Sequence, residues 1–206
     1  TPSSICRLKT GNRLIAEAHP GNSMIQIFPA EKRYIQRMGW LDVYSVFSCN
    51  NYFDPWNTHF ANLIAFNEYV MQPGFGFNMH PHEDIEQVFL VTEGQLSHAD
   101  SLGNEGVLSP GGIQSISAGS GYARYACNRG DAPCRYLAAW FTPNALRMTP
   151  RYAGALFPGG AHGEPVPLVS GSPELLRAFH EFPPLAINSN ATLYTLRLHA
   201  SEYPDS

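Results

Sequence analysis

Charged side chains are scarce in this sequence, where they make up 15% of the 206 residues, against roughly 25% in an average soluble domain. Thirteen Lys and Arg residues are set against seventeen Asp and Glu residues, which gives a formal net charge of -4. This balance argues against direct nucleic-acid binding, because neutralising phosphates requires a basic patch. No run approaches the roughly 18 consecutive apolar residues of a membrane-spanning helix, so no membrane association is expected.

Two further sequence patterns are not found: an apolar segment of the signal-peptide kind at the start of the given sequence, and a C-x-x-C pair. The stretch from Thr1 to Met24 has no apolar centre of the signal-peptide kind, so we expect a cytoplasmic protein with reduced thiols. No C-x-x-C pair occurs, which disfavours a zinc ribbon. Cys127 and Cys134 bracket a predicted hairpin loop, and they are interpreted as two ordinary thiols, with a redox disulfide as the alternative.

Glycine and proline, by contrast, are plentiful: 18 glycines and 17 prolines are spread along the chain. They separate short runs that are rich in β-branched and aromatic residues. We expect strands over residues 25–28, 63–70, 86–92, 95–98, 107–108, 113–117 and 135–141. Strand-length runs at short intervals, with hardly any helical periodicity, indicate an antiparallel sandwich or barrel.

The stretch from Gly74 to Gly94 carries the strongest sign of a functional site. His80 and His82 are two positions apart, so on a strand both imidazoles project from one face and can reach the same metal ion. Glu86, four positions further on, is expected to share that face. The spacing is close to the first motif of the cupin barrels, whose interior binds a metal through two or three histidines and a glutamate.

Further blocks extend this similarity along the chain. They are Gly39-Trp-Leu-Asp42, Phe47-Ser48, Asn51-Tyr-Phe-Asp-Pro55, His80-Pro-His82, Asp100-Ser-Leu-Gly-Asn104, Ser117-Ala-Gly-Ser-Gly121 and Thr149-Pro-Arg-Tyr152. Together and in this order they resemble the pirin family over residues 25–152. The resemblance implies an all-β, cupin (jelly-roll) fold in a tandem bicupin, with iron or a similar metal in the N-terminal barrel. It also implies quercetin 2,3-dioxygenase activity, or a role as a transcription cofactor or redox sensor.

The resemblance sets the expected domains. Residues 1–24 form an irregular arm and residues 25–152 the N-terminal cupin barrel. Residues 153–206 hold a linker (153–167), a short helix (174–181) and the start of a truncated or degenerate second cupin, which would need on the order of a hundred residues to be complete. A last strand over 191–199 either completes the first barrel's sheet or pairs with a second subunit in a homodimer.

The sequence departs from the family at two of the four metal-ligand positions. The resemblance assigns two ligands to His80 and His82, and the other two, a histidine and a glutamate, to positions that hold Arg124 and Ala126 here. Arginine stays protonated and alanine has no donor atom, so the usual site is expected to be broken. The cofactor is therefore predicted to be either none or a divalent metal, iron being the first choice, held by His80, His82 and Glu86.

Other arrangements of the same residues remain open. His98 could turn inward as an additional ligand, or the histidines could line an organic pocket without a metal. In that pocket Arg124 would grip a carboxylate or phenolate, flanked by Tyr122 and Tyr125 as phenol donors or acid–base groups. The competing interpretation of Arg124 is a structural salt bridge with Glu86 or Asp84.

Three functions follow from these alternatives. The first, which we rank ahead, is a metal-independent or atypically metallated enzyme whose barrel binds a small aromatic or phenolic molecule. Its catalytic candidates are His80, His82, Arg124, Tyr122 and Tyr125. The second is an iron-dependent oxygenase of the quercetin 2,3-dioxygenase type, using the two histidines and Glu86. The third is a non-enzymatic redox sensor or transcription cofactor that uses Cys127 or Cys134.

Overall fold

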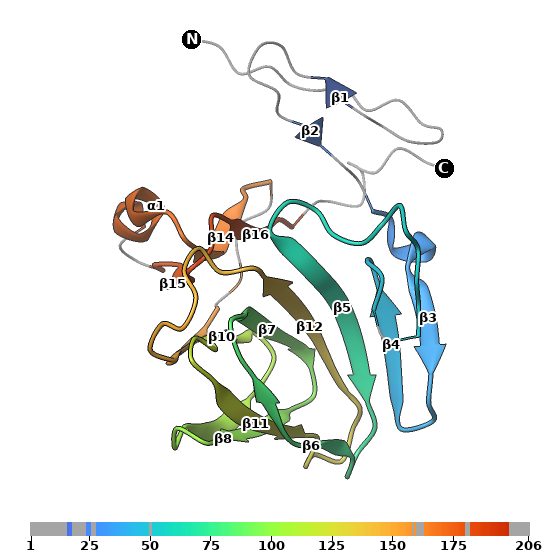
Figure 1. Ribbon diagram of the computed structural model, residues 1–206. Helices are drawn as coiled ribbons and strands as arrows, with labels where there is room; N and C mark the ends of the chain where they lie inside the picture. Colours follow the sequence, from blue (N-terminus) through green and yellow to red (C-terminus); the bar gives the residue numbers. More distant parts are fainter. Residues whose placement is uncertain are drawn as a thin grey trace.

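Two β-sheets packed face to face form the body of the protein (Figure 1). The computed structural model describes residues 16–17, 24–25, 28–49, 51–157, 159, 163–179 and 182–197. A short antiparallel ladder of β1 (Ala16–Glu17) and β2 (Met24–Ile25) and a 3-10 turn at Ala30–Lys32 precede the sheets. No helix in these ranges is both long and apolar enough to cross a membrane.

The larger sheet has seven strands in the order β13-β10-β7-β12-β5-β4-β3. Their bounds are β3 Tyr34–Arg37, β4 Leu41–Ser45, β5 Leu63–Met71, β7 Glu86–Glu93, β10 Gly112–Ser117, β12 Cys134–Phe141 and β13 Arg151–Leu156. All neighbouring pairs are antiparallel. The alternation of buried and half-buried side chains along β4 is that of a strand with one face on a core.

The smaller sheet has the order β6-β11-β8-β9 and lies across the larger one (Figure 1). Its strands are β6 Gly76–His82, β11 Tyr122–Cys127, β8 Leu96–Asp100 and β9 Glu105–Leu108. Side chains of both sheets, among them Met71, Val91 and Leu96, meet in one buried cluster. Gly76 lets β6 approach β11 closely, because a Cβ there would lie 2.3 Å from the Cβ of Cys127.

A third sheet covers the outer face of the larger one. It consists of β14 (Val166–Ser170), β15 (Leu185–Ala186) and β16 (Thr192–Thr195), in the order β15-β14-β16. Leu168 and Val169 of β14 pack in a second buried cluster with Val88 of β7 and Phe141 of β12. The helix α1 (Pro173–Ala178) follows β14.

The structure corrects several expectations for the C-terminal part. Residues 153–156, predicted as linker, belong to β13 and pair with β10. The predicted helix over 174–181 is shorter, from 173 to 178, and is capped by Ser172, whose Oγ accepts a bond from the Leu175 N–H. The strand expected over 191–199 spans 192–195 and pairs with β14, rather than with the first barrel's sheet. Residues 180–181 and 198–206 lie outside the described ranges.

Candidate functional site

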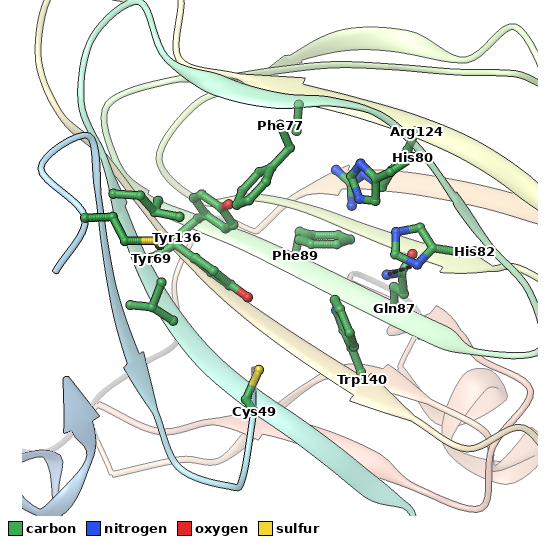
Figure 2. Close-up of a pocket in the computed structure, with 14 residues that line it drawn as sticks. Cys49, Tyr69, Phe77, His80, His82, Gln87, Phe89, Arg124, Tyr136 and Trp140 are labelled. Atoms are coloured by element: carbon green, nitrogen blue, oxygen red, sulfur yellow. Dashed lines mark hydrogen bonds between the residues drawn. The ribbon is translucent and has the colours of Figure 1, made fainter. Parts of the chain in front are cut away.

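A cavity of about 270 Å³ opens between the two facing sheets (Figure 2). Most of its wall is apolar, with five aromatic side chains: Tyr69, Phe77, Phe89, Tyr136 and Trp140. The rings of Tyr69 and Tyr136 stack at a centroid distance of 5.0 Å. Burial raises the pKa of Tyr69 to about 12, so its phenol stays protonated at neutral pH. The cavity is therefore suited to a flat, apolar ligand.

The polar groups gather at one end of the cavity. His80 and His82 come from β6, Arg124 from β11 and Gln87 from β7, and Figure 2 shows the four side chains together. Arg124 lies opposite His80 in the β6–β11 pairing, and the two imidazole centroids are 4.7 Å apart. The i, i+2 spacing on β6 thus places both histidines on the cavity side.

Arg124 is a nearly unpaired buried cation. Its side chain is 4% exposed, and its guanidinium lies 3.8 Å from the centroid of the Phe89 ring. Nη2 donates a long bond of 3.4 Å to Oε1 of Gln114, whereas Nη1 has no partner among the described residues. Burial lowers the pKa of Arg124, which expresses the cost of holding this charge away from water.

The salt bridge considered for Arg124 is not formed. Oε2 of Glu86 accepts bonds from the Ser117 hydroxyl at 2.7 Å and the Asn188 N–H at 2.9 Å. Asp84 accepts from the backbone N–H of Arg147 at 2.6 Å. Arg124 therefore points into the cavity without a carboxylate partner in the part of the chain that the structure describes.

The two histidines differ in their hydrogen bonds. Nδ1 of His80 lies 2.7 Å from the backbone oxygen of Asn78. Since a carbonyl only accepts, Nδ1 carries the proton in neutral His80 and Nε2 keeps a lone pair. Nε2 of His82 is buried and has no partner among the described residues. Burial, together with the charges of His80 and Arg124, lowers the pKa of His82 to about 4, so His82 is neutral at neutral pH.

Glu86 does not join the histidines, contrary to the sequence-based expectation. The chain turns between β6 and β7, with Asp84 at a φ of 47°, and this turn breaks the alternation on which the prediction depended. Gln87 lies on the cavity side instead, with its Nε2 3.5 Å from Nδ1 of His82. His98 does not turn into the cavity either; its Nε2 lies 3.4 Å from the Tyr152 hydroxyl.

The two tyrosines that flank Arg124 have different positions. The buried Tyr122 donates its hydroxyl hydrogen to Oε1 of Gln87. Tyr122 is not among the residues that line the cavity, so it acts on the polar end through Gln87. Tyr125 is on the opposite face of β11, where its hydroxyl is 2.6 Å from Sγ of Cys127. Tyr125 therefore does not line the cavity, because neighbouring residues on a strand point to opposite sides.

The cysteines are separate thiols in the described structure. Cys127 and Cys134 are both buried and unbridged. Burial raises the pKa of Cys134 to about 11, which disfavours the reactive thiolate. Cys49, half-buried, lines the cavity.

The donor set at this end does not fit the four-ligand metal site that the resemblance implies. Within the described ranges no group of three or more His, Cys, Asp or Glu side chains is arranged to hold an ion. The two positions that would complete the set, Arg124 and Ala126, both line the cavity, and neither side chain offers a lone pair to a cation. A fixed guanidinium beside the imidazoles also repels a cation.

Sequence reasoning missed Gln87, Tyr69, Tyr136 and Cys49. Gln87 had a weak signal, because it is a polar residue directly before the apolar run of a buried strand. The others had none, since a buried tyrosine or cysteine on a strand is most often part of the core.

Comparisons with known proteins identify the relatives of this chain. The pirin family model matches residues 29–141. A putative quercetin 2,3-dioxygenase of Zymomonas mobilis is 39% identical over 137 residues, which are 66% of this chain and 58% of that protein. The quercetin 2,3-dioxygenase of Escherichia coli K12 is 37% identical over 130 residues, 63% of this chain and 56% of that protein. The chain thus spans 56% to 58% of the length of these two relatives.

The solved structures agree with the family match. The bacterial pirin YhhW of Escherichia coli, in complex with nickel(II), superposes with a TM-score of 0.72 at 30% identity, over 81% of this chain and 69% of that one. Together with the two facing antiparallel sheets, this match confirms the predicted all-β cupin fold. That relative is in complex with nickel(II), whereas Arg124 and Ala126 of this chain offer no metal donor at the two positions to which the resemblance assigns ligands.

Proposed function

The chain belongs to the pirin family, and we propose that it is a metal-independent member whose cavity binds a small aromatic molecule through an anionic oxygen and acts on it by proton transfer. One observation carries the proposal: Arg124 is a buried cation without a carboxylate partner, aimed into a cavity with aromatic walls. The proposal concerns the site within this chain, since the chain spans little more than half of the curated relatives.

The ligand class follows from the cost of the buried charge. An unpaired ion away from water is strongly unfavourable, and its partial contacts with Phe89 and Gln114 offset only part of that cost. A carboxylate, phenolate or enolate oxygen would complete the pairing through Nη1. Phe89 and Trp140 would pack against the ring of the same ligand. The site therefore favours an aromatic acid or phenol over a neutral sugar or an aliphatic cation.

Proton transfer follows from the hydrogen bond that His80 makes with the backbone oxygen of Asn78. The lone pair on Nε2 of His80 is a base that takes a proton from an acidic C–H or O–H of the bound ligand. The bond to that hydrogen breaks and its electron pair moves through the conjugated system onto a neighbouring carbonyl oxygen of the ligand, which becomes an enolate beside the anionic oxygen that Arg124 holds, so the guanidinium stabilises the new negative charge. Returning the proton to the other atom of the conjugated system completes a tautomerisation. Charge and atoms balance without an oxidant.

The other two functions, an iron-dependent oxygenase and a redox sensor or transcription cofactor, stay predictions. The relatives' names favour an oxygenase, but Glu86 is bonded to Ser117 and Asn188 rather than placed beside the histidines. A redox sensor would use Cys127 or Cys134, which are both buried.

Calorimetric titration of the chelator-treated protein with 4-hydroxybenzoate tests the proposal. We expect Arg124→Met to weaken binding at least tenfold, as loss of a charge-assisted bond does. Arg177→Met, the same exchange at the exposed end of α1, should leave the affinity unchanged. Equal affinity in wild type and Arg124→Met would overturn the proposal, and so would binding that appears only after a metal is added.

A further inference from the structure

Gln87 is a fully buried amide near the start of β7, directly before its apolar run. Its side chain is 0% exposed, and its neighbours on β7 are Glu86 and Val88. It lies between the Tyr122 hydroxyl on one side and the His82 ring on the other. A buried amide costs free energy unless both of its ends are bonded, so its two contacts determine which way it faces.

The Tyr122 hydroxyl fixes the orientation of the amide. Burial raises the pKa of Tyr122, so the phenol stays protonated, and it donates its hydrogen to Oε1 of Gln87. If the amide were turned around, this hydrogen would lose the one acceptor that it has among the described residues, and the buried hydroxyl would face the amide N–H instead. The acceptor end of Gln87 therefore faces Tyr122, and the donor end, Nε2, faces His82.

The donor end in turn fixes the tautomer of His82. Because an amide N–H only donates, Nδ1 of His82, at 3.5 Å, is the unprotonated nitrogen of the neutral ring. The proton is then on Nε2, the buried atom without a partner among the described residues. His80 has the opposite tautomer, with its proton on Nδ1. One imidazole thus offers a donor to the cavity, and the other offers a lone pair.

We propose that Gln87 is a positioning residue that holds His82 as the Nε2–H tautomer, so that His82 and Arg124 together select a deprotonated ligand oxygen. A carboxylate can accept from both N–H groups through its two oxygens and carries the negative counter-charge that Arg124 lacks, whereas a neutral amide has one accepting oxygen, no charge, and an NH₂ group that can only donate. The same tautomer leaves Nε2 without a lone pair for a metal. The selectivity part of this inference depends on the proposed function; the tautomer part does not.

The tautomer can be measured in the ligand-free full chain. Two-bond ¹H–¹⁵N correlation spectra of protein labelled at histidine, recorded at neutral pH, distinguish protonated from unprotonated ring nitrogens. The His82 signals are assigned by their loss in His82→Gln. We expect a protonated Nε2 and an unprotonated Nδ1 for His82, and the reverse for His80. A protonated Nδ1 in neutral His82 would overturn the inference, whatever the protein binds.

Two variants connect the tautomer to ligand choice. Gln87→Glu replaces the donor with an acceptor, so Nδ1 of His82 should become protonated, and affinity for benzoate should fall at least tenfold relative to benzamide. Gln87→Leu removes the donor without adding a charge and should reduce the preference for benzoate over benzamide. Gln95→Glu, the same charge change on an exposed turn, is the control.

The outcomes separate the two proposals. If neither ligand binds while His82 shows the expected tautomer, the proposed function fails and the role of Gln87 in holding the ring stands. If benzoate binds and the preference for it is unchanged in Gln87→Leu, the inference about Gln87 is overturned and the proposed function stands. Should the Gln87 variants fail to fold, the wild-type spectrum still decides the tautomer.

Discussion

The guanidinium of Arg124 lies 3.8 Å from the centre of the Phe89 ring, and Arg124 lines the cavity without a carboxylate partner among the described residues. The contact is a cation–π interaction, worth about 0.5–2 kcal/mol depending on how far it is desolvated. The idealised cost of burying an unpaired ion is several times larger. The pair therefore lowers the cost of the buried charge without removing it, and Nη1, which has no hydrogen-bond partner among the described residues, is the atom that we propose binds an anionic ligand oxygen.

Replacing Arg124 with methionine should stabilise the ligand-free protein. Methionine keeps the contact with Phe89 and removes the buried charge, so the free energy of unfolding should rise by roughly 1–2 kcal/mol, as in other replacements of buried charges by apolar residues. Urea unfolding followed by tryptophan fluorescence measures the change. Arg177→Met should have no effect, since Arg177 is exposed. A loss of stability in Arg124→Met would mean that the charge is already balanced in the free protein.

His82 should make the protein less stable in acid. Its pKa is about 4 in the folded chain, lowered by burial and by His80 and Arg124, against the ordinary 6.5. The unfolded chain therefore binds the proton first, and stability is full above pH 6.5 and falls as the pH decreases toward 4. The ring is partly exposed, so solvent screening reduces the loss to on the order of 1–2 kcal/mol.

The measurement is a set of urea unfolding curves between neutral and acidic pH for wild type and His82→Gln. The difference between the two proteins isolates the contribution of His82 to the pH dependence of stability. Two other buried groups also contribute: the lowered pKa of His98 reduces stability in acid as His82 does, whereas the raised pKa of Glu86 increases it. Parallel curves for the two proteins over this range would contradict the prediction.

The part of the site that lies on one continuous strand was predictable from the sequence, because side chains alternate between the two faces of a strand. His80 and His82 lie on one continuous strand, so their shared face followed from their spacing. Glu86 lies beyond a turn at Asp84, a residue with positive φ, and no simple pattern marks a non-glycine residue in that conformation. Tyr125 was grouped with Arg124, although adjacent residues on a strand face opposite ways.

In the fold, too, elements that depend on local sequence were predictable, whereas elements that depend on a tertiary partner were not. The central strands were predictable from their β-branched and aromatic runs, with β7 observed at Glu86–Glu93 against an expected 86–92. Residues 153–156 were expected to be linker because they are rich in glycine and alanine. They form a strand because β10 offers them a free edge to pair with, and composition does not report such tertiary partners.

His80 should be needed for proton transfer and not for binding. In His80→Gln the base is lost while Arg124 and His82 remain, so exchange of the benzylic hydrogens of phenylpyruvate with D₂O should slow by about 10²–10⁴-fold. Proton NMR follows the exchange, and calorimetry should show an affinity for benzoate close to that of wild type. His59→Gln, an exposed histidine outside the cavity, is the matched control. Undiminished exchange in His80→Gln would exclude His80 as the base.

Restoring the two lost donors should convert the cavity into a metal site. Arg124 lies opposite His80 in the β6–β11 pairing, and Ala126 is two positions further along β11 on the same cavity-lining face. A histidine and a glutamate at these positions would join His80 and His82, in the set that the family resemblance implies. Removing the guanidinium also removes the positive charge that opposes a cation there.

We therefore expect the Arg124→His, Ala126→Glu double variant to bind Ni(II) near-stoichiometrically, measured by elemental analysis after dialysis and by calorimetry. Wild type and the single Ala126→Glu variant should bind it far more weakly, because both keep Arg124. The Nε2–H tautomer of His82 predicts a further gain when Gln87→Leu is added, since His82 is then free to present its lone pair. Stoichiometric Ni(II) in wild type, lost in His80→Ala, would show instead that the chain recruits donors other than Arg124 and Ala126, and the metal-independent assignment would then be wrong.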